Sequence, residues 1–163
     1  MVAWKDFAAE APKIASLFVR RHSATGNLCL LATLRSDGYP RISPLEPRIV
    51  DGQLVLVGMP ATLKFADLDR DPRFALHTAT TDPHVADGDA KLWGDAHHLP
   101  DTDFHRRFAD DLFAHSGFDL RGQTFDRFHV ADLKGASSLE VVANQLEIRI
   151  WKPGHGERVV RKT

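Results

Sequence analysis

Arg41 and Lys64 are the two residues whose types and positions point most directly to chemistry. Arg41 lies in an otherwise apolar extended stretch, and Lys64 follows Thr62, a residue type that favours the N-cap of a helix. A guanidinium grips a phosphate at two points, an ammonium acts as a point charge, and the free amides of a helix N-terminus add donors. The pattern allows a phosphate site at Arg41, Thr62 and Lys64, although each cation alone is also typical of an ordinary surface position.

Other catalytic and metal-binding patterns are absent or weak. The sequence has no Gly-x-Ser-x-Gly elbow, no Walker A motif and no Gly-x-Gly-x-x-Gly. His97 and His98 are adjacent, so on a strand they point to opposite faces and cannot easily share an ion. Asp101, Asp103 and His105 follow in no spacing that a known ligand set demands, and we expect no metal site. One histidine suffices to hold haem iron, but no position stands out.

Length and composition indicate one globular domain of 163 residues, with 43% hydrophobic and 26% charged residues. The net charge of −1 gives no reason to expect nucleic acid or an acidic membrane as a partner. A single cysteine, Cys29, excludes an intramolecular disulfide and a cysteine zinc site. No apolar run approaches the roughly 20 residues that span a bilayer, and residues 1–21 lack the core of a signal peptide. We therefore expect a cytoplasmic protein.

Periodicity predicts a series of short strands and three helices. The chain opens with a helix over about 5–22, and Asp37-Gly38 and Asp51-Gly52 are hairpin turns because glycine permits a positive φ. The other expected elements are strands over 28–35, 40–50, 53–57, 73–80, 91–99, 125–134, 138–142 and 146–151, and helices over 62–69 and from 100–103 onward. The prolines within 40–50 cannot donate to a ladder, so parts of that stretch should lie at an edge.

Strands joined by short turns favour antiparallel pairing, because parallel strands need a crossover. The expected fold is mainly β with peripheral helices, in a barrel or sandwich. No linker divides the chain, so we expect a single domain over 1–163, with the barrel at about 27–152 and a short charged tail over 157–163.

The order of these elements resembles the FMN-binding split barrel of pyridoxamine 5'-phosphate oxidase-like proteins. In that family the first hairpin reads Ala-Thr-x-x-x-Asp-Gly-x-Pro and leads into an arginine-bearing strand, as residues 32–40 and Arg41 do here. A Ser/Thr-x-Lys helix start is matched by Thr62-Leu63-Lys64, and an Asp/Asn-Pro-Arg turn by Asp71-Pro72-Arg73. The resemblance is closest over residues 28–80.

The resemblance implies an antiparallel split β-barrel that forms a homodimer, with the cofactor in a groove between the subunits. It implies hydride or electron transfer to a small-molecule substrate that the sequence does not identify. The cofactor would carry out that chemistry, so the protein needs no catalytic side chain of its own. Arg41, Thr62 and Lys64 would contact the phosphate. The residues that would lie beside the flavin ring or ribityl chain are Ile42, Ser43, Val57 and Gly58, and Trp93 is the tryptophan to test for ring contact.

Two positions depart from the true oxidases. Glu46 stands where they carry a basic residue, and Leu63 stands where they usually carry an arginine. Their C-terminal arginine and histidine pattern is also not evident. FMN is the expected cofactor, and the deazaflavin coenzyme F-420 and haem are alternatives. Two other functions are consistent with the sequence. The first is a flavin- or haem-binding protein without enzymatic activity, and the second is a cofactor-free dimeric module.

Overall fold

The computed structural model describes residues 1–80 and 82–162. Its N-terminal part contains two helices, α1 (Trp4–Glu10) and α2 (Pro12–Ala24), where the sequence predicted one helix over 5–22. Pro12 causes the break, since it has no amide hydrogen and its ring would clash with the preceding turn of a continuous helix. It occupies the first turn of α2, the position where proline is tolerated.

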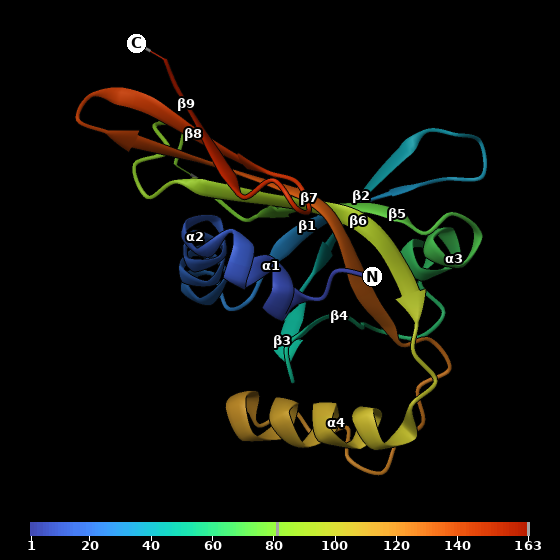
Figure 1. Cartoon of the computed structure of the whole chain (residues 1–163). Helices are drawn as coiled ribbons and strands as arrows, with labels where there is room; N and C mark the ends of the chain where they lie inside the picture. Colours follow the sequence, from blue (N-terminus) through green and yellow to red (C-terminus); the bar gives the residue numbers. More distant parts are fainter. Residues whose placement is uncertain (81, 163) are drawn as a thin grey trace.

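Within the described residues, nine strands form one open, antiparallel sheet (Figure 1). The strand order is β2-β1-β5-β6-β7-β4-β3, with β8 paired to β7 and β9 paired to β8. The strands are β1 (Cys29–Leu34), β2 (Pro40–Leu45), β3 (Arg48–Val50), β4 (Gln53–Leu56), β5 (Arg73–Thr78), β6 (Asp89–His98), β7 (His129–Val142), β8 (Gln145–Trp151) and β9 (Glu157–Lys162). The sheet does not close between β2 and β3, as expected for a split barrel.

Three features differ from the expected strands. The stretch 40–50 divides into β2 and β3 at Pro47, and β2 is an edge strand, which confirms the edge position expected from its prolines. The segments 125–134 and 138–142 form one long strand, β7, which pairs with β6 over most of its length. The charged tail contains β9, so the sheet extends beyond residue 152; its backbone pairs with β8 although most of its side chains are exposed.

Helices cover the sheet in two places. α1 and α2 lie together against one face (Figure 1), where Phe7, Ile14 and Phe18 pack on apolar side chains of the central strands. α4 (Thr102–Ser116) packs Phe104 and Phe108 against Phe128, which is fully buried. α3 (Leu63–Arg70) lies near β1, and its C-cap residue is Asp71, directly before Pro72, where the sequence predicted the helix to stop.

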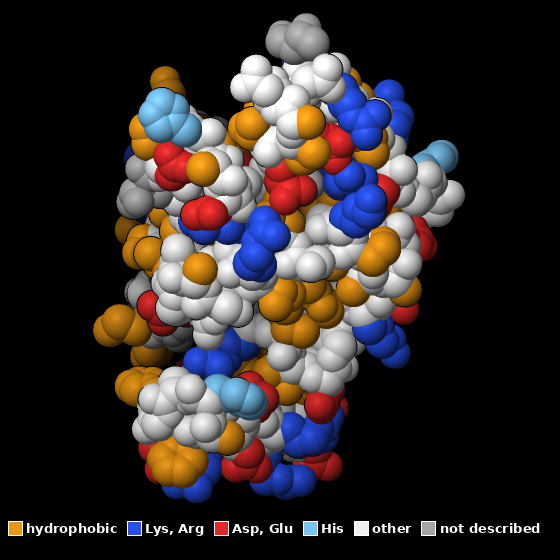
Figure 2. Space-filling model, turned by 90° about the vertical axis from the view of Figure 1, so that its left-hand side faces the viewer, with side chains coloured by type: hydrophobic (Ala, Val, Ile, Leu, Met, Phe, Trp, Pro, Cys, Tyr) orange, Lys and Arg blue, Asp and Glu red, His pale blue; other side chains and the backbone are white. Residues whose placement is uncertain are grey.

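The surface carries both signs of charge. On the face drawn in Figure 2, basic and acidic side chains are interspersed, with hydrophobic side chains between them. This distribution agrees with the net charge of −1. Among the described residues, no helix combines the length and apolar character needed to cross a bilayer.

Candidate functional site

Edge strand β2 divides the residues predicted at the cofactor into two groups. Successive side chains of a strand point to opposite faces. Arg41 is half-buried and lies opposite Thr33 of β1, on the face that α3 covers. Ile42 points to the other face and is 72% exposed. Ser43 shares the face of Arg41, so the strand separates a polar side near α3 from an apolar outer side.

A buried carboxylate holds Arg41 in place. Asp67 of α3 is only 3% exposed, and its Oδ2 accepts hydrogen bonds from Arg41 Nε at 2.6 Å and from Thr33 Oγ1 at 2.9 Å. Arg70 donates to Oδ1 of the same carboxylate at 3.3 Å. Burial alone would raise the pKa of Asp67, but the hydrogen bonds from Arg41, Thr33 and Arg70 bring it below its ordinary value of 3.8. Arg41 is therefore anchored through Nε, which leaves its terminal nitrogens for a ligand.

Lys64 and Thr62 lie at the start of α3. Lys64 Nζ donates to the carbonyl oxygen of Pro44 in β2 at 2.6 Å, which brings the ammonium to the same strand as Arg41. Burial lowers the pKa of Lys64, and the charge of Glu46 opposes that shift. Thr62 is the N-cap residue, but its hydroxyl donates to the carbonyl of Met59 at 3.2 Å instead of capping the helix. The first turn of α3 thus has no side-chain cap.

Val57 and Gly58 follow β4 and differ in their surroundings. A methyl group at Gly58 would lie 3.0 Å from the ring of Phe65, so the small residue lets that buried ring pack on the backbone. Val57 packs instead against the apolar cluster beneath α4. The structure therefore brings Gly58 next to α3 and turns Val57 toward a different part of the core.

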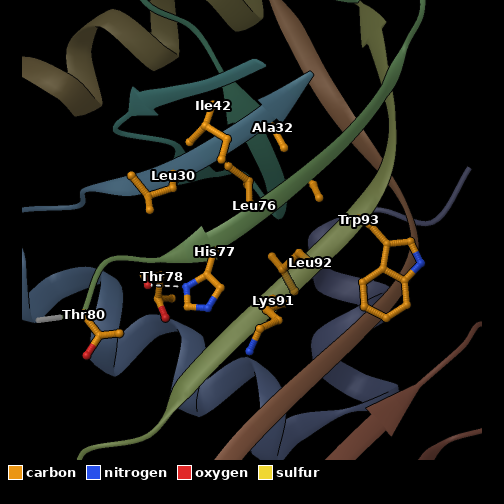
Figure 3. A pocket seen from close by; sticks show the side chains of 11 residues that line it. Leu30, Ala32, Ile42, Leu76, His77, Thr78, Thr80, Lys91, Leu92 and Trp93 are labelled. Atoms are coloured by element: carbon orange, nitrogen blue, oxygen red, sulfur yellow. Dashed lines mark hydrogen bonds between the residues drawn. The ribbon is translucent and has the colours of Figure 1, made fainter. Parts of the chain in front are cut away.

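Ile42 and Trp93 line a hollow of about 390 Å³ on the outer face of β1, β5 and β6 (Figure 3). Its walls are mainly apolar and include Leu30, Ala32 and Ala75. The Trp93 ring lies close against Gly135 of β7, where a methyl group would overlap the indole. The glycine thus permits the ring to lie flat along the sheet, and the predicted residues Ile42 and Trp93 share one cavity.

The polar end of the hollow is built on Asp89. Lys91 Nζ lies 2.5 Å from Asp89 Oδ1, and His77 Nε2 lies 3.8 Å from Oδ2. His77 Nδ1 donates to the carbonyl oxygen of Thr78 at 2.7 Å. Because a carbonyl oxygen only accepts, Nδ1 carries a proton, and in the neutral ring Nε2 keeps its lone pair.

Sequence reasoning missed Asp67, His77 and Asp89. Asp67 left a signal, since it lies beside Leu68 on the apolar side of the predicted helix, where an acidic residue needs a buried partner. No pattern in the sequence points to His77 and Asp89, because their proximity depends on the pairing of β5 with β6.

The residues around β2 fit one phosphate group. Arg41, Lys64 and the uncapped start of α3 supply donors of three kinds on one side of the strand. The positive charge is modest, because Asp67 pairs with Arg41 and Glu46 acts on Lys64. We call Arg41, Thr62 and Lys64 the anion cradle.

An open antiparallel sheet with this strand order has the architecture of a split barrel. A family model described as pyridoxamine 5'-phosphate oxidase matches residues 19–142, and the chain belongs to this family. No curated protein sequence matches the chain.

Solved structures share the fold at low sequence identity. A pyridoxamine 5'-phosphate oxidase-related, FMN binding protein from Nostoc punctiforme is 14% identical with a TM-score of 0.60, over 93% of this chain and 95% of that one. PhzG from Burkholderia lata, in complex with tetrahydrophenazine-1-carboxylic acid, is 13% identical with a TM-score of 0.56, over 89% and 90%. A heme binding protein from Mycobacterium smegmatis is 21% identical with a TM-score of 0.54, over 88% of this chain and 55% of that one. At these identities the likeness establishes the fold.

Replacing Asp67 tests the anchoring of Arg41. Asp67→Asn removes the charge that accepts three hydrogen bonds, so the free energy of unfolding at pH 7 should fall by about 1–3 kcal/mol. Because the folded-state pKa of Asp67 is lowered, its stabilising effect is present above about pH 4 and is lost as the pH falls further. Urea denaturation at pH 7 and about pH 3 should therefore show a difference between the two proteins that narrows in acid.

The control is Asp37→Asn, which alters an exposed carboxylate paired with Arg35 and should change stability little at either pH. A difference between wild type and Asp67→Asn that stays constant down to about pH 3 would contradict the assignment.

Proposed function

We propose that the chain is an FMN-dependent oxidoreductase acting on a small molecule. The observation that carries the proposal is the anion cradle, in which Asp67 fixes Arg41 and Lys64 reaches the same edge strand. The family and the FMN binding protein of the same fold support this choice of cofactor. The phosphate would lie at the cradle, and the ring would extend past Ser43 toward Ile42 and the hollow.

FMN, when bound, supplies the transfer of a hydride or of single electrons. The chain's own residues then have three tasks. Arg41 and Lys64 neutralise the phosphate and set the position of the cofactor. Ile42, Leu30 and Trp93 provide an apolar surface that displaces water from the reacting face. Lys91 would offer a hydrogen-bond donor and Nε2 of the neutral His77 ring an acceptor at the far end of the hollow, where a polar group of a substrate would find partners.

The cradle is tested by titrating the protein with FMN and with riboflavin, which lacks the phosphate, and following flavin fluorescence. In the double variant Arg41→Gln/Lys64→Gln, FMN affinity should fall at least about tenfold, since charge-assisted hydrogen bonds contribute about 1.5–3 kcal/mol each. Riboflavin affinity should change little. Lys152→Gln, at an exposed lysine of the β8–β9 loop, is the matched control and should leave both affinities unchanged.

Glu46→Lys should tighten FMN binding, because it removes a negative charge near Lys64 and adds a positive one. Equal losses for FMN and riboflavin in the double variant would show that no phosphate is bound there. A parallel titration with the deazaflavin coenzyme F-420 decides between the two flavin-type cofactors, since tight binding of only one identifies it.

We also propose that the protein is a homodimer in which a second copy covers the outer face of the sheet. Leu30 and Ile42 are 43% and 72% exposed on this face, beside the open side of the hollow. A partner there would bury these side chains and enclose the cofactor ring.

Ile42→Glu places a charge in this interface and should convert the dimer to a monomer, as measured by sedimentation equilibrium. Val19→Glu, at an exposed apolar side chain of α2, is the control and should not alter the mass. A monomeric wild-type protein, or a variant that remains dimeric, would contradict the use of this face.

Haem binding without enzymatic activity is the second candidate, and His77 is the observation that favours it. A ligating histidine typically donates its other ring nitrogen to a backbone carbonyl, as His77 Nδ1 does to Thr78. His77 also lines an apolar hollow. A heme binding protein of the same fold is consistent with this reading.

Haemin added to the protein should then give a sharp Soret band that His77→Ala broadens and shifts, whereas His84→Ala, at an exposed loop histidine, leaves it unchanged. Identical spectra for wild type and His77→Ala would exclude His77 as the axial ligand. A folded dimer that binds neither flavin nor haem would leave the interaction module as the remaining reading.

A further inference from the structure

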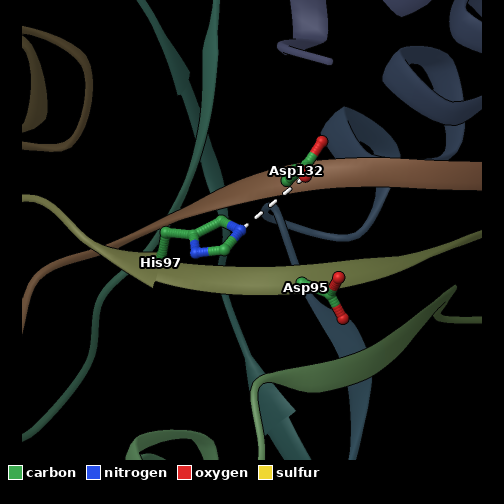
Figure 4. A group of neighbouring side chains, drawn as sticks. All are labelled: Asp95, His97 and Asp132. Atoms are coloured by element: carbon green, nitrogen blue, oxygen red, sulfur yellow. Dashed lines mark ion pairs between the residues drawn. The ribbon is translucent and has the colours of Figure 1, made fainter. Parts of the chain in front are cut away.

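Asp95, His97 and Asp132 form a cluster outside the proposed cofactor site (Figure 4). One ligand atom from each residue lies within 4.8 Å of the others. Asp95 and His97 are two residues apart on β6, so they point to the same face, and Asp132 lies on the neighbouring strand β7 directly opposite Asp95. The cluster thus combines one imidazole with two carboxylates.

An irregularity in the sheet produces this arrangement. The pairing of β6 with β7 shifts register between Trp93 and Gly94, and the pair Asp95–Asp132 follows the shift. Gly94 lies so close to Asp132 that a methyl group would overlap the Asp132 backbone carbonyl. Only a glycine permits this approach, and bulges of this kind frequently re-aim side chains near functional sites.

The cluster places two carboxylates opposite each other on paired strands. Like charges directly opposite each other on paired strands are destabilising. Asp132 is 5% exposed, and it accepts from the Val2 amide at 2.6 Å and from Lys134 Nζ at 2.7 Å. Among the residues that the structure describes, Asp95 has no hydrogen-bond or ion-pair partner. Lys134 and the N-terminal ammonium act on Asp132, and Arg73 of β5 lies opposite Asp95 but directs its guanidinium to Asp71. The Asp95 carboxylate oxygens therefore stay available to an ion.

The separation of the ligand atoms also suits a shared ion. His97 Nε2 lies 3.7 Å from Asp132 Oδ2, which is too long for a hydrogen bond. Two ligand atoms that each lie about 2.1 Å from a tetrahedral zinc ion are about 3.4 Å apart. Small movements of the half-exposed His97 and Asp95 side chains would complete such a site.

We propose that Asp95, His97 and Asp132 bind one divalent transition-metal ion, with water completing its coordination. An imidazole with two carboxylates suits Zn²⁺, Fe²⁺ or Mn²⁺, and zinc binds most tightly of these three in the usual order of affinities. Mg²⁺ prefers oxygen ligands and retains its water, so it should bind much more weakly. The ion would link β6 to β7 and, through Asp132, to the N-terminal segment at Val2.

The test is isothermal titration of tag-free, chelator-treated protein with ZnCl₂ in the absence of flavin. We expect one ion per chain. His97→Ala and Asp95→Asn should each weaken binding at least about tenfold. Lys134→Met should strengthen it, because it removes a cation that competes for Asp132 Oδ2. MgCl₂ should bind at least about tenfold more weakly than ZnCl₂.

His115→Ala is the matched control among the nine histidines. His115 Nδ1 lies 3.3 Å from Asp111 Oδ1 on α4, so it is also a histidine beside a carboxylate. Among the residues that the structure describes, it does not belong to a group of three ligands. Its replacement should leave zinc binding unchanged. Thermal denaturation provides a second readout, since zinc should raise the melting temperature of wild type and not of His97→Ala.

The proposal fails if zinc does not bind, if His115→Ala weakens binding as much as His97→Ala, or if Lys134→Met weakens it. Because neither the metal titration nor its variants involve the anion cradle, the result is independent of whether FMN binds.

Discussion

The ion pair between Asp67 and Arg41 is the interaction on which the candidate site depends. A buried carboxylate is unfavourable unless donors surround it, and Asp67 receives them from Thr33 of β1, Arg41 of β2 and Arg70 of its own helix. The same contacts fix α3 against the first hairpin. One set of contacts therefore anchors α3 and also holds the Arg41 guanidinium where a ligand could reach it.

Edge strand β2 gives the site its two-sided character. Because the sheet is open at β2, one face of the strand contributes Arg41 to the polar side near α3, and the other contributes Ile42 to the apolar hollow. An elongated cofactor with an anionic end and a flat apolar end would meet both environments by crossing this edge. A closed barrel would have no such edge, so the open topology and the proposed cofactor are compatible for a physical reason.

The sequence predicted the features that local chemistry controls. The turns at Gly38 and Gly52, the end of α3 before Pro72 and the edge position of β2 all follow from the backbone preferences of glycine and proline. Residue type and position suggested the grouping of Arg41 with Lys64, and the family resemblance reinforced it. The missed features depend on long-range pairing: Asp67 meets Arg41 across 26 residues, and β9 is hidden in a charged segment because its stability comes from pairing with β8.

The contact between Trp93 and Gly135 has a spectroscopic consequence. Trp4 and Trp151 are 7% and 0% exposed within the core, whereas Trp93 borders the hollow. A collisional quencher in solution reaches an indole at the surface and is excluded from the core. The quenchable part of the tryptophan emission, excited at a wavelength that tyrosine does not absorb, therefore belongs to Trp93. Occupancy of the hollow can thus be followed in the unlabelled native protein without adding a dye.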